Sequence, residues 1–532
     1  MPKSLGKNVL KGAGIVSFFL LLGKAMVFVQ KLVIADRFGT GMEADAFTLA
    51  FSSIIFAFSI IPLKVLAPVL PLFAERREKT GAKDAWRFAS TVGSLTVIIL
   101  AVTTLCGILG ASHLVGWASN FSGEKAQLTT KLVRLMFPAT FFLGLFALLT
   151  LIMHAYKRFT LPALGETLNR VMIIVVLIVL FRFFGIVALA LGVVAGAVVC
   201  VLLQLVGLRH ELPWVRFSVN WRDPSFRELL RLIPPVIVAI LIAQGRTILD
   251  FWFTSGMGQG YTSSLSYAKG LSDTMIQVVP FAIGVVIYPF FSDMIAAGDK
   301  DGFTKALMNS FRMMAFFFIP ISAGFIVLGR PIIQLAFERG QFTPESVTLT
   351  AGPFFYYALG LTWFALEIIL MRFYFAMKDT WTPAWVGLGC VLLHVAIILA
   401  TRGAMLHQSV ALAAALSKCV KVILLFILLK PMLSSLQLRE NALFAVKTLV
   451  AAACMAVAVH FVYGAVSSAV PVPAGAGKML TAGYLGGQIG VAVGAGLAVF
   501  AGIALALRTP EAASVLRFLK LKGGLRRGEA TT

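Results

Sequence analysis

Charged residues are scarce in this chain. Only 13% of its 532 residues are Asp, Glu, Lys or Arg, whereas 59% are hydrophobic and the mean hydropathy is +0.92. Because about a quarter of the residues in soluble domains are charged, this composition excludes an ordinary soluble protein. Apolar stretches of about 20 residues recur along the chain, each long enough to cross a ~30 Å hydrocarbon core. The alternation typical of membrane β-barrels is missing. We therefore predict an all-α polytopic membrane protein.

Cysteines and catalytic clusters are also sparse. The five cysteines stand singly in apolar segments, which excludes a disulfide framework or the paired spacing of a metal site. No loop gathers the His, Asp and Glu side chains of a catalytic site. The sequence therefore predicts no enzyme, no metal and no cofactor.

The apolar stretches predict about fourteen membrane spans joined by short connections. The start, MPKSLGKNVLKG, is basic and precedes an apolar run without an A-x-A-like cleavage site, so we read that run as a retained first span. The predicted spans are residues 11–36, 44–73, 88–117, 131–155, 161–183, 185–208, 228–254, 261–291, 306–336, 347–376, 382–401, 408–430, 442–465 and 480–507.

The net charge of +23 is concentrated between the spans, which indicates membrane topology and not nucleic-acid binding. The segments 75–87 and 209–231 and the C-terminal tail are rich in Lys and Arg, whereas TSGMGQGY after the seventh span has none. The positive-inside rule then places both termini in the cytoplasm, as an even number of spans requires.

Two segments of the chain resemble each other. PLFAERREKTGAKDAWRF closes the second span and PFFSDMIAAGDKDGFTKAL closes the eighth, with the same order of proline, apolar pair, acid and Gly-containing turn. A chance likeness of amphipathic loops is the alternative. A repeat would give two six-span lobes and two C-terminal spans, with a substrate site between the lobes. The predicted divisions are 1–210, 211–435 and 436–532.

Three lysines inside spans have no acidic partner at helical spacing. Lys24 and Lys31 share one face of the first span because seven residues make nearly two turns, and Lys64 lies in the second. A lysine near the bilayer centre costs roughly 2.5–3.5 kcal/mol. Lys31 and Lys64 are close enough to span ends to snorkel, but Lys24 is not. These lysines favour an anion that reaches several of them, such as a pyrophosphate.

Opposite charges also occur four residues apart on single helices, where they can neutralise each other or simply be tolerated in the bundle interior. The pairs are Glu166 with Arg170, Arg246 with Asp250, and Lys269 with Asp273.

Several motifs resemble one known family. The most specific is LAFERGQFTPESVTLTAGPFFYYALGLTWFALEIILMRFYFAMKDTWTP, residues 335–383. FGTGMEADAF at 38–47 and YAKGLSDTMIQVVPFAIGVVIYP at 267–289 match as well. The chain resembles the bacterial MurJ/MviN lipid II flippases of the MOP exporter superfamily over essentially its whole length.

The resemblance implies a flippase of the bacterial inner membrane. Such a protein carries an undecaprenyl-pyrophosphate-linked saccharide to the outer leaflet by alternating access, and we expect it to act as a monomer. In the family, basic residues of spans 1, 2 and 8 line a cationic cavity, and spans 13 and 14 form a groove for the lipid tail.

Individual site residues follow from position in the family pattern. Lys24 and Gln30 stand where the family has arginines, with Lys31 beside Gln30, and Asp45 matches an acid of the first loop. The paired arginines of span 2 are missing, and Lys64 lies lower in that span. In span 8, Lys269 keeps a positive charge displaced by one position, and Asp273 matches an acid.

The ion-coupling residues depart from the pattern. Asp250, next to Arg246, matches the span 7 acid through which some members bind sodium, but His394 and apolar residues replace the span 11 ligands.

These departures keep alternatives open. One is a flippase for a different polysaccharide repeat unit. Another is a cation-coupled drug exporter of the same superfamily, which would favour acidic cavity residues. A membrane glycosyl- or acyltransferase is a third, disfavoured by the missing catalytic cluster.

Overall fold

The computed structural model describes residues 3–377, 379–434, 437–473 and 477–512, with backbone alone for 3–13, 277–290 and a few neighbouring positions. The described chain consists of helices and their connections and contains no strand. It forms two compact units, Met1–Ser266 and Tyr267–Thr532.

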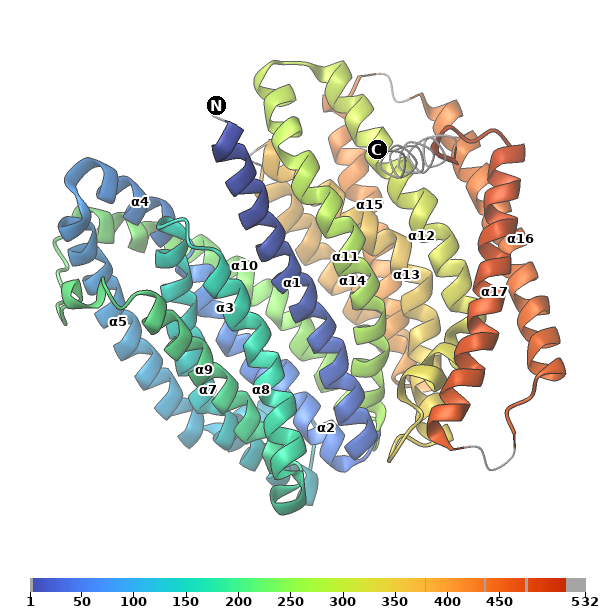
Figure 1. Ribbon diagram of the computed structural model, residues 1–532, viewed down its shortest axis with the longest axis horizontal. Helices are drawn as coiled ribbons and strands as arrows, with labels where there is room; N and C mark the ends of the chain where they lie inside the picture. The colour runs from blue at the N-terminus through green and yellow to red at the C-terminus, as the bar shows by residue number, and fades with distance from the viewer. Residues whose placement is uncertain (1–2, 378, 435–436, 474–476, 513–532) are drawn as a thin grey trace, which may run out of the picture. The chain divides into compact units, whose positions relative to one another are not determined.

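The first unit contains the helices drawn from blue to green in Figure 1. They are α1 (Lys3–Phe38), α2 (Met42–Thr48), the π-helical segment η1 (Leu49–Ile55), α3 (Phe56–Val65), α4 (Val69–Thr80), α5 (Ala82–Leu109), α6 (Ala111–Ala118), α7 (Gly123–Ala155), α8 (Thr160–Phe184), α9 (Val187–Gly207), the 3₁₀ turn η2 (Leu212–Trp214) and α10 (Pro224–Ser255). Helix α11 (Tyr261–Ala296) begins in this unit and continues into the second.

Small residues let helices α8 and α9 approach closely. A Cβ added to Gly192 would lie 3.1 Å from the Ile173 Cα, and one added to Gly196 would lie 2.8 Å from the Asn169 carbonyl oxygen. Larger residues at either position would push the two helices apart. This is the small-residue packing that the apolar, glycine-bearing sequence of α9 favours in a membrane.

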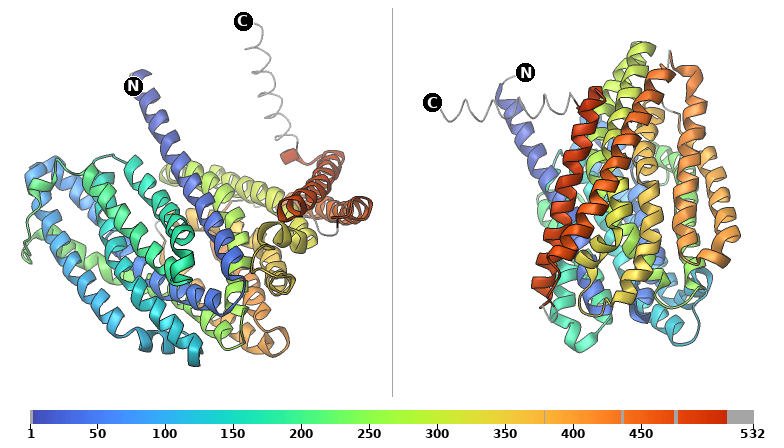
Figure 2. Two further views of the ribbon diagram at one scale, coloured as in Figure 1. Left: turned by 60° about the horizontal axis from the view of Figure 1, so that its bottom comes forward. Right: turned by 90° about the vertical axis from the view of Figure 1, so that its right-hand side faces the viewer.

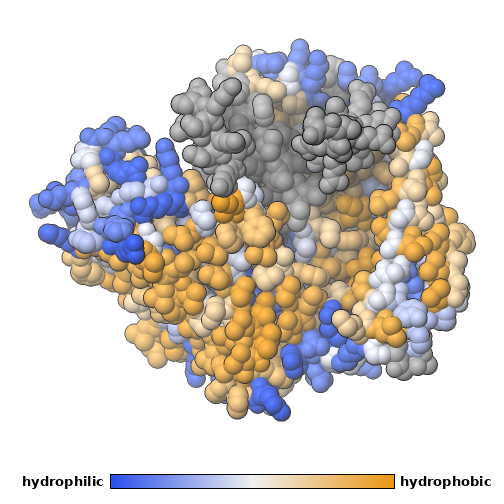
Figure 3. Space-filling model, in the orientation of Figure 1, coloured by the Kyte–Doolittle hydropathy of each residue, from blue (hydrophilic) through white to orange (hydrophobic). Residues whose placement is uncertain are grey.

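A charged cluster ties together one end of the first unit. Arg76 donates to both carboxylate oxygens of Asp223 at 2.7 and 2.8 Å and to Asp84 at 2.6 Å. Asp223 in turn accepts from the backbone N–H of Phe226 and so caps α10. The guanidinium therefore holds the starts of α5 and α10 to the end of α4, in the hydrophilic region near the α4–α5 connection in Figure 3.

The flank of α8 is hydrophobic, as Figure 3 shows. Ile178 and Val179 are more than half exposed, and Phe183 is 78% exposed. Exposed side chains of this kind on a long apolar helix suit contact with lipid and not with water.

The second unit has its own core and its own helices. They are the rest of α11, α12 (Lys300–Phe337), α13 (Pro344–Ala376), α14 (Trp381–Met405), α15 (Gln408–Leu429), the 3₁₀ turn η3 (Lys430–Met432), α16 (Leu438–Ala469) and α17 (Lys478–Ala506). Helix α13 packs on α12 and α15, α14 packs on α15, and α16 and α17 lie side by side (Figure 2). Phe303, Phe318 and Phe373 are buried in the core.

The two resembling segments of the sequence turn in a similar way. The connection between α4 and α5 passes through Gly81 at φ 91°, and that between α11 and α12 passes through Gly298 at φ 71°. Glycine reaches these left-handed conformations without a Cβ penalty.

Thirteen helical segments among the described residues are long and apolar enough to cross a membrane. The remaining predicted span, 261–291, coincides with α11, whose side chains from 277 to 290 lie outside the described residues. The prediction of an all-α polytopic membrane protein is confirmed. The divisions 1–210, 211–435 and 436–532 stay predictions. The seventh span, α10, belongs to the first of the two compact units.

Candidate functional site

The two lysines of the first span have different surroundings. Lys24 is exposed on α1 and makes no hydrogen bond or salt bridge within the described part of the chain. Lys31 is half-buried, about 10 Å further along the helix by the rise of 1.5 Å per residue, and its ammonium donates to the Ser266 carbonyl oxygen at 2.7 Å. Gln30 beside it is buried. Of these two lysines, Lys24 is therefore the one whose ammonium is available to a ligand.

The second span contains an irregular stretch near its start. Residues Leu49–Ile55 are π-helical, a geometry that is frequent at functional sites. Ser53 lies within it with a buried hydroxyl that has no hydrogen-bond partner among the described residues. Lys64, near the end of α3, is exposed and forms no salt bridge in that same part of the chain.

Asp45 is fully buried and makes four hydrogen bonds. Its Oδ2 accepts from the Lys125 ammonium and the Gly260 N–H, each at 2.7 Å. Its Oδ1 accepts from the N–H and the hydroxyl of Ser263, at 2.8 and 2.7 Å. A carboxylate at this place satisfies the free N–H groups that begin α11 and favours its positive dipole end. In this conformation Asp45 joins helix ends, and its predicted contact with substrate stays a prediction.

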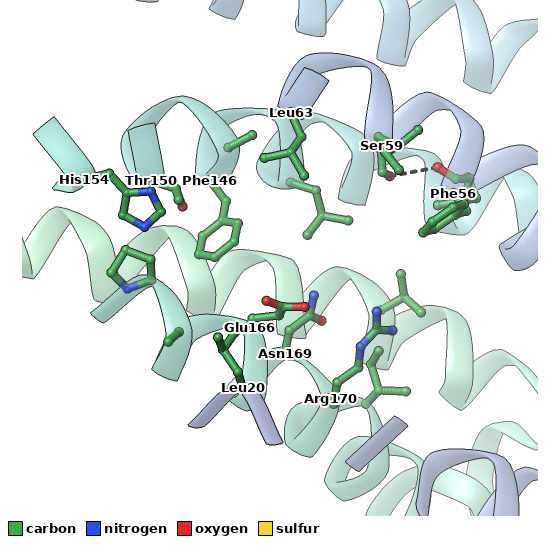
Figure 4. A pocket seen from close by; sticks show the side chains of 18 of the residues that line it. Leu20, Phe56, Ser59, Leu63, Phe146, Thr150, His154, Glu166, Asn169 and Arg170 are labelled. Carbon is green, nitrogen blue, oxygen red and sulfur yellow. Dashed lines mark hydrogen bonds between the residues drawn. The ribbon is translucent and has the colours of Figure 1, made fainter. Parts of the chain in front are cut away.

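Glu166 and Arg170 line a cavity of about 390 Å³ inside the first unit. Figure 4 shows their side chains and that of Asn169 rising from α8 toward Ser59 and Leu63 of α3 and Phe146 and His154 of α7. The salt bridges of the described residues do not include Glu166 with Arg170. Apart from Ser59, Thr150 and His154, the other lining residues are apolar, so the three polar side chains of α8 face mostly apolar walls.

The other two predicted pairs are likewise not among the described salt bridges. Asp250 is buried, and Nε of Arg246 is buried without a hydrogen-bond partner within the described part of the chain. Lys269 and Asp273 are both half-buried on α11 in the second unit. Spacing of four residues permits a pair, but neither Glu166 with Arg170 nor Lys269 with Asp273 forms a salt bridge among the described residues.

A buried charge cluster in the second unit was missed by the sequence reading. Glu367 on α13 accepts from two lysines of α15: Lys421 at 2.7 Å from Oε1, and Lys418 through Oε2. The side chains are mostly buried: Glu367 is 13% exposed, Lys421 is 14% exposed and Lys418 is 21% exposed. The signal in the sequence was two lysines three residues apart inside an apolar span, and their partner lies 51 and 54 residues away.

An apolar cavity of about 670 Å³ lies in the second unit between α12, α16 and α17. Phe316, Met455, Val459 and Phe500 are among the side chains that line it, and no charged residue does so. It is suited to an aliphatic or isoprenoid chain.

The comparison with protein families decides the classification. A family model described as lipid II flippase MurJ matches residues 34–472. The chain belongs to the lipid II flippase MurJ family.

Individual relatives agree with this assignment. A probable lipid II flippase MurJ of Vibrio cholerae serotype O1 is 28% identical over 402 residues, which cover 72% of this chain and 76% of that protein. A solved structure of lipid II flippase MurJ in an inward closed conformation matches with a TM-score of 0.76 at 20% identity, over 94% of this chain and 100% of that one.

A multidrug resistance MATE family transporter of the MOP superfamily, in its inward-facing conformation, matches less well. Its TM-score is 0.68 at 13% identity, over 77% of this chain and 94% of that one. These structural likenesses establish a shared fold. Membership of the MurJ family makes the protein a multi-pass membrane transporter, which agrees with the prediction that it is not an enzyme.

Proposed function

We propose that the protein is a flippase that moves a polyprenyl-pyrophosphate-linked saccharide, lipid II or a related envelope precursor, across a bacterial inner membrane by alternating access. The observation that carries the proposal is the family match over residues 34–472. A charged head group must cross a medium in which an unpaired charge is costly. The protein therefore has to supply counter-charge to the pyrophosphate.

Lys24 is the first candidate for that counter-charge. It is exposed on α1 and unpaired among the described residues, so no native partner has to be displaced when a phosphate binds. Lys64 is exposed as well, and Lys269 and Asp273 are half-buried on α11. Lys31 already donates to Ser266 and would have to exchange that bond, so we place it after Lys24.

The lipid tail requires a different surface. We assign it to the apolar cavity between α12, α16 and α17, where each buried CH₂ group contributes about 0.8 kcal/mol. Holding the tail there keeps the isoprenoid in an apolar environment while the head group moves.

The orientation of the termini and the oligomeric state are also part of the proposal. The basic segments 75–87 and 209–231 place both termini in the cytoplasm under the positive-inside rule. We expect a monomer that needs no nucleic acid. Membrane-impermeant labelling of cysteines introduced into these segments and the mass of the detergent-purified protein test the two points.

Replacing Lys24 tests the proposed function. K24A removes the cation that meets the pyrophosphate, and we expect flipping of a fluorescent polyprenyl-pyrophosphate saccharide in proteoliposomes to fall at least ten-fold, the effect of losing roughly 1.5–3 kcal/mol of charge-assisted hydrogen bonding. K24R keeps the charge and should keep most of the activity. Full activity of K24A would refute the role of Lys24.

The drug-exporter alternative makes the opposite prediction. Its cationic substrates would be repelled by Lys24 and Lys64, so K24A would improve export and a deletion strain would become drug-sensitive. Mass spectrometry of lipids that co-purify with the protein separates the two functions directly.

A further inference from the structure

The connection between α9 and α10 contains a stretch in which apolar and polar residues alternate. This stretch, VRFSVNWR at residues 215–222, is apolar at every odd position and polar at every even one. In an extended chain this pattern puts the apolar side chains on one face and the polar side chains on the other. Val215 has extended dihedral angles, and Phe217 and Trp221 are 76% and 57% exposed. The apolar face is therefore largely open to the surroundings of the protein.

Two serines of α5 hold this stretch in place. The backbone N–H groups of Arg216 and Ser218 donate to the hydroxyls of Ser90 and Ser94, each at 3.1 Å. Four residues of helix rise about 6 Å and two residues of extended chain span about 6.6 Å, so the stretch runs along α5. In Figure 1 the connection is drawn in green beside α5. We call residues 214–222 the strap.

The strap lies near the level at which α5 becomes apolar. Arg87 is the last charged residue of α5, and residues 88–109 contain no Asp, Glu, Lys or Arg. Ser90 and Ser94 lie about 5 and 10 Å beyond Arg87 by the rise of the helix. Amphipathic segments at a membrane surface insert their apolar face by about 5–10 Å, to the boundary of headgroups and acyl chains. Tryptophan is enriched at the same level. The depth and the composition of the strap therefore both indicate a position at the membrane interface.

The strap carries positive charge without an acidic partner. The two acids that flank it, Glu211 and Asp223, form salt bridges with arginines outside it. Arg216 and Arg222 are exposed and form no salt bridge within the described part of the chain. A guanidinium is suited to phosphate because it donates two parallel hydrogen bonds to two oxygens. These arginines therefore favour a phosphate-bearing partner outside the chain.

We propose that the strap is a lipid-binding surface. It inserts Phe217 and Trp221 between the upper parts of the acyl chains, and Arg216 and Arg222 bind the phosphates of anionic phospholipids. Anionic headgroups fit better than zwitterionic ones, because the strap contains no acid to bind the ammonium of a zwitterion. This surface is separate from the transported substrate, so the inference does not depend on the proposed function.

Quenching of tryptophan fluorescence by brominated lipids tests the position of the strap. The full-length protein is reconstituted in vesicles of phosphatidylcholine and phosphatidylglycerol, and the strap's contribution is the difference between the wild type and W214F/W221F. We expect bromine near the glycerol end of the acyl chains to quench this contribution more strongly than bromine near the methyl end or iodide in the water. Quenching by iodide alone would place the strap in water, and quenching by none of the three would mean that protein covers it. Either result would overturn the proposal.

Moving the bromine from one lipid to the other tests the role of the arginines. In the same lipid mixture, we expect the wild-type strap to prefer phosphatidylglycerol over phosphatidylcholine by roughly ten-fold, because basic side chains near a membrane surface attract anionic lipid. R216Q/R222Q keeps both reporter tryptophans and should lose the preference, whereas R216K/R222K keeps the charge and should keep most of it. Both arginines are exposed, so these variants should fold.

A control variant separates a local effect from a general loss of charge. R439Q removes an exposed arginine at the start of α16 and should leave the preference of the strap unchanged. Equal quenching of the wild type by the two brominated lipids, or an unchanged preference in R216Q/R222Q, would overturn the assignment of an anionic lipid to this surface.

Discussion

Asp45 in the first unit and Glu367 in the second are both buried acids, but they are satisfied by different kinds of donor. Asp45 receives two backbone N–H groups, one hydroxyl and one ammonium. Glu367 receives two ammonium groups and has no backbone donor among its described hydrogen bonds. Their positions explain the contrast. Asp45 lies at the start of α11, where the first N–H groups have no partner within the helix. Glu367 lies in the middle of α13, where the backbone N–H groups already form the hydrogen bonds of the helix.

The comparison shows what each site is able to do. A carboxylate held by backbone N–H groups and one lysine forms a charge-balanced helix cap that fixes a connection. A carboxylate held by two lysines of another helix forms a charged link between α13 and α15. The first arrangement fixes the start of one helix, and the second joins two helices along their length.

The largest effect is expected from E367A. It leaves Lys418 and Lys421 facing each other without a carboxylate, and removing one side of a buried charge pair costs about 3–5 kcal/mol. Thermal unfolding of the detergent-purified protein should show a large loss of stability.

Two further variants sharpen that result. The apolar triple variant E367M/K418M/K421M should recover most of the stability, because well-packed apolar groups replace the buried charges. K79M, which removes an exposed pair with Glu75, should leave the melting temperature unchanged. A loss in E367A no larger than that in K79M would show that the cluster is unimportant to stability.

A smaller effect is expected from D45N. The amide keeps the shape but loses the charge that Lys125 and the start of α11 require, at a cost of roughly 1.5–3 kcal/mol. Faster amide exchange at residues 260–266, with unchanged exchange in α13, would locate the damage. If D45N changed the exchange rates of residues 260–266 no more than those of α13, Asp45 would not hold the start of α11.

The smallest effect is expected from S263A. It removes one of the four donors to Asp45 while the Ser263 N–H stays in place, so the loss should be about 0.5–1.5 kcal/mol. The melting temperature should fall less than in D45N. A larger fall than in D45N would show that the hydroxyl, and not the charge of Asp45, dominates this cap.

Much of the fold was readable from the sequence because membrane spans are encoded locally. The length and composition of the apolar stretches predicted the helices, and for 161–183 against Thr160–Phe184 of α8 the ends differ by one residue each. The second span shows the limit. Its residues 44–73 became α2, η1, α3 and part of α4, because the π-helical segment and the turn after Val65 interrupt a uniformly apolar run.

The candidate site was only partly readable. The sequence singled out Lys24 as a cation without a partner, and it has none among the described residues. The sequence also offered Glu166 with Arg170 and Lys269 with Asp273 as pairs, and neither pair forms a salt bridge among the described residues. Helical spacing identifies side chains that share a face, not the rotamers that they choose. Glu367 escaped notice because its partners lie on another helix.

The sequence by itself determined that this is a multi-span helical membrane protein with lysines inside its spans, because hydrophobic length and charge scarcity act locally along the chain. Only the tertiary structure decided which charges meet. It brought Lys125, Gly260 and Ser263 to Asp45 and placed Lys418 and Lys421 on Glu367. Those contacts depend on how helices pack, and electrostatic pairing in an apolar medium is decided by atomic distance and not by distance along the sequence.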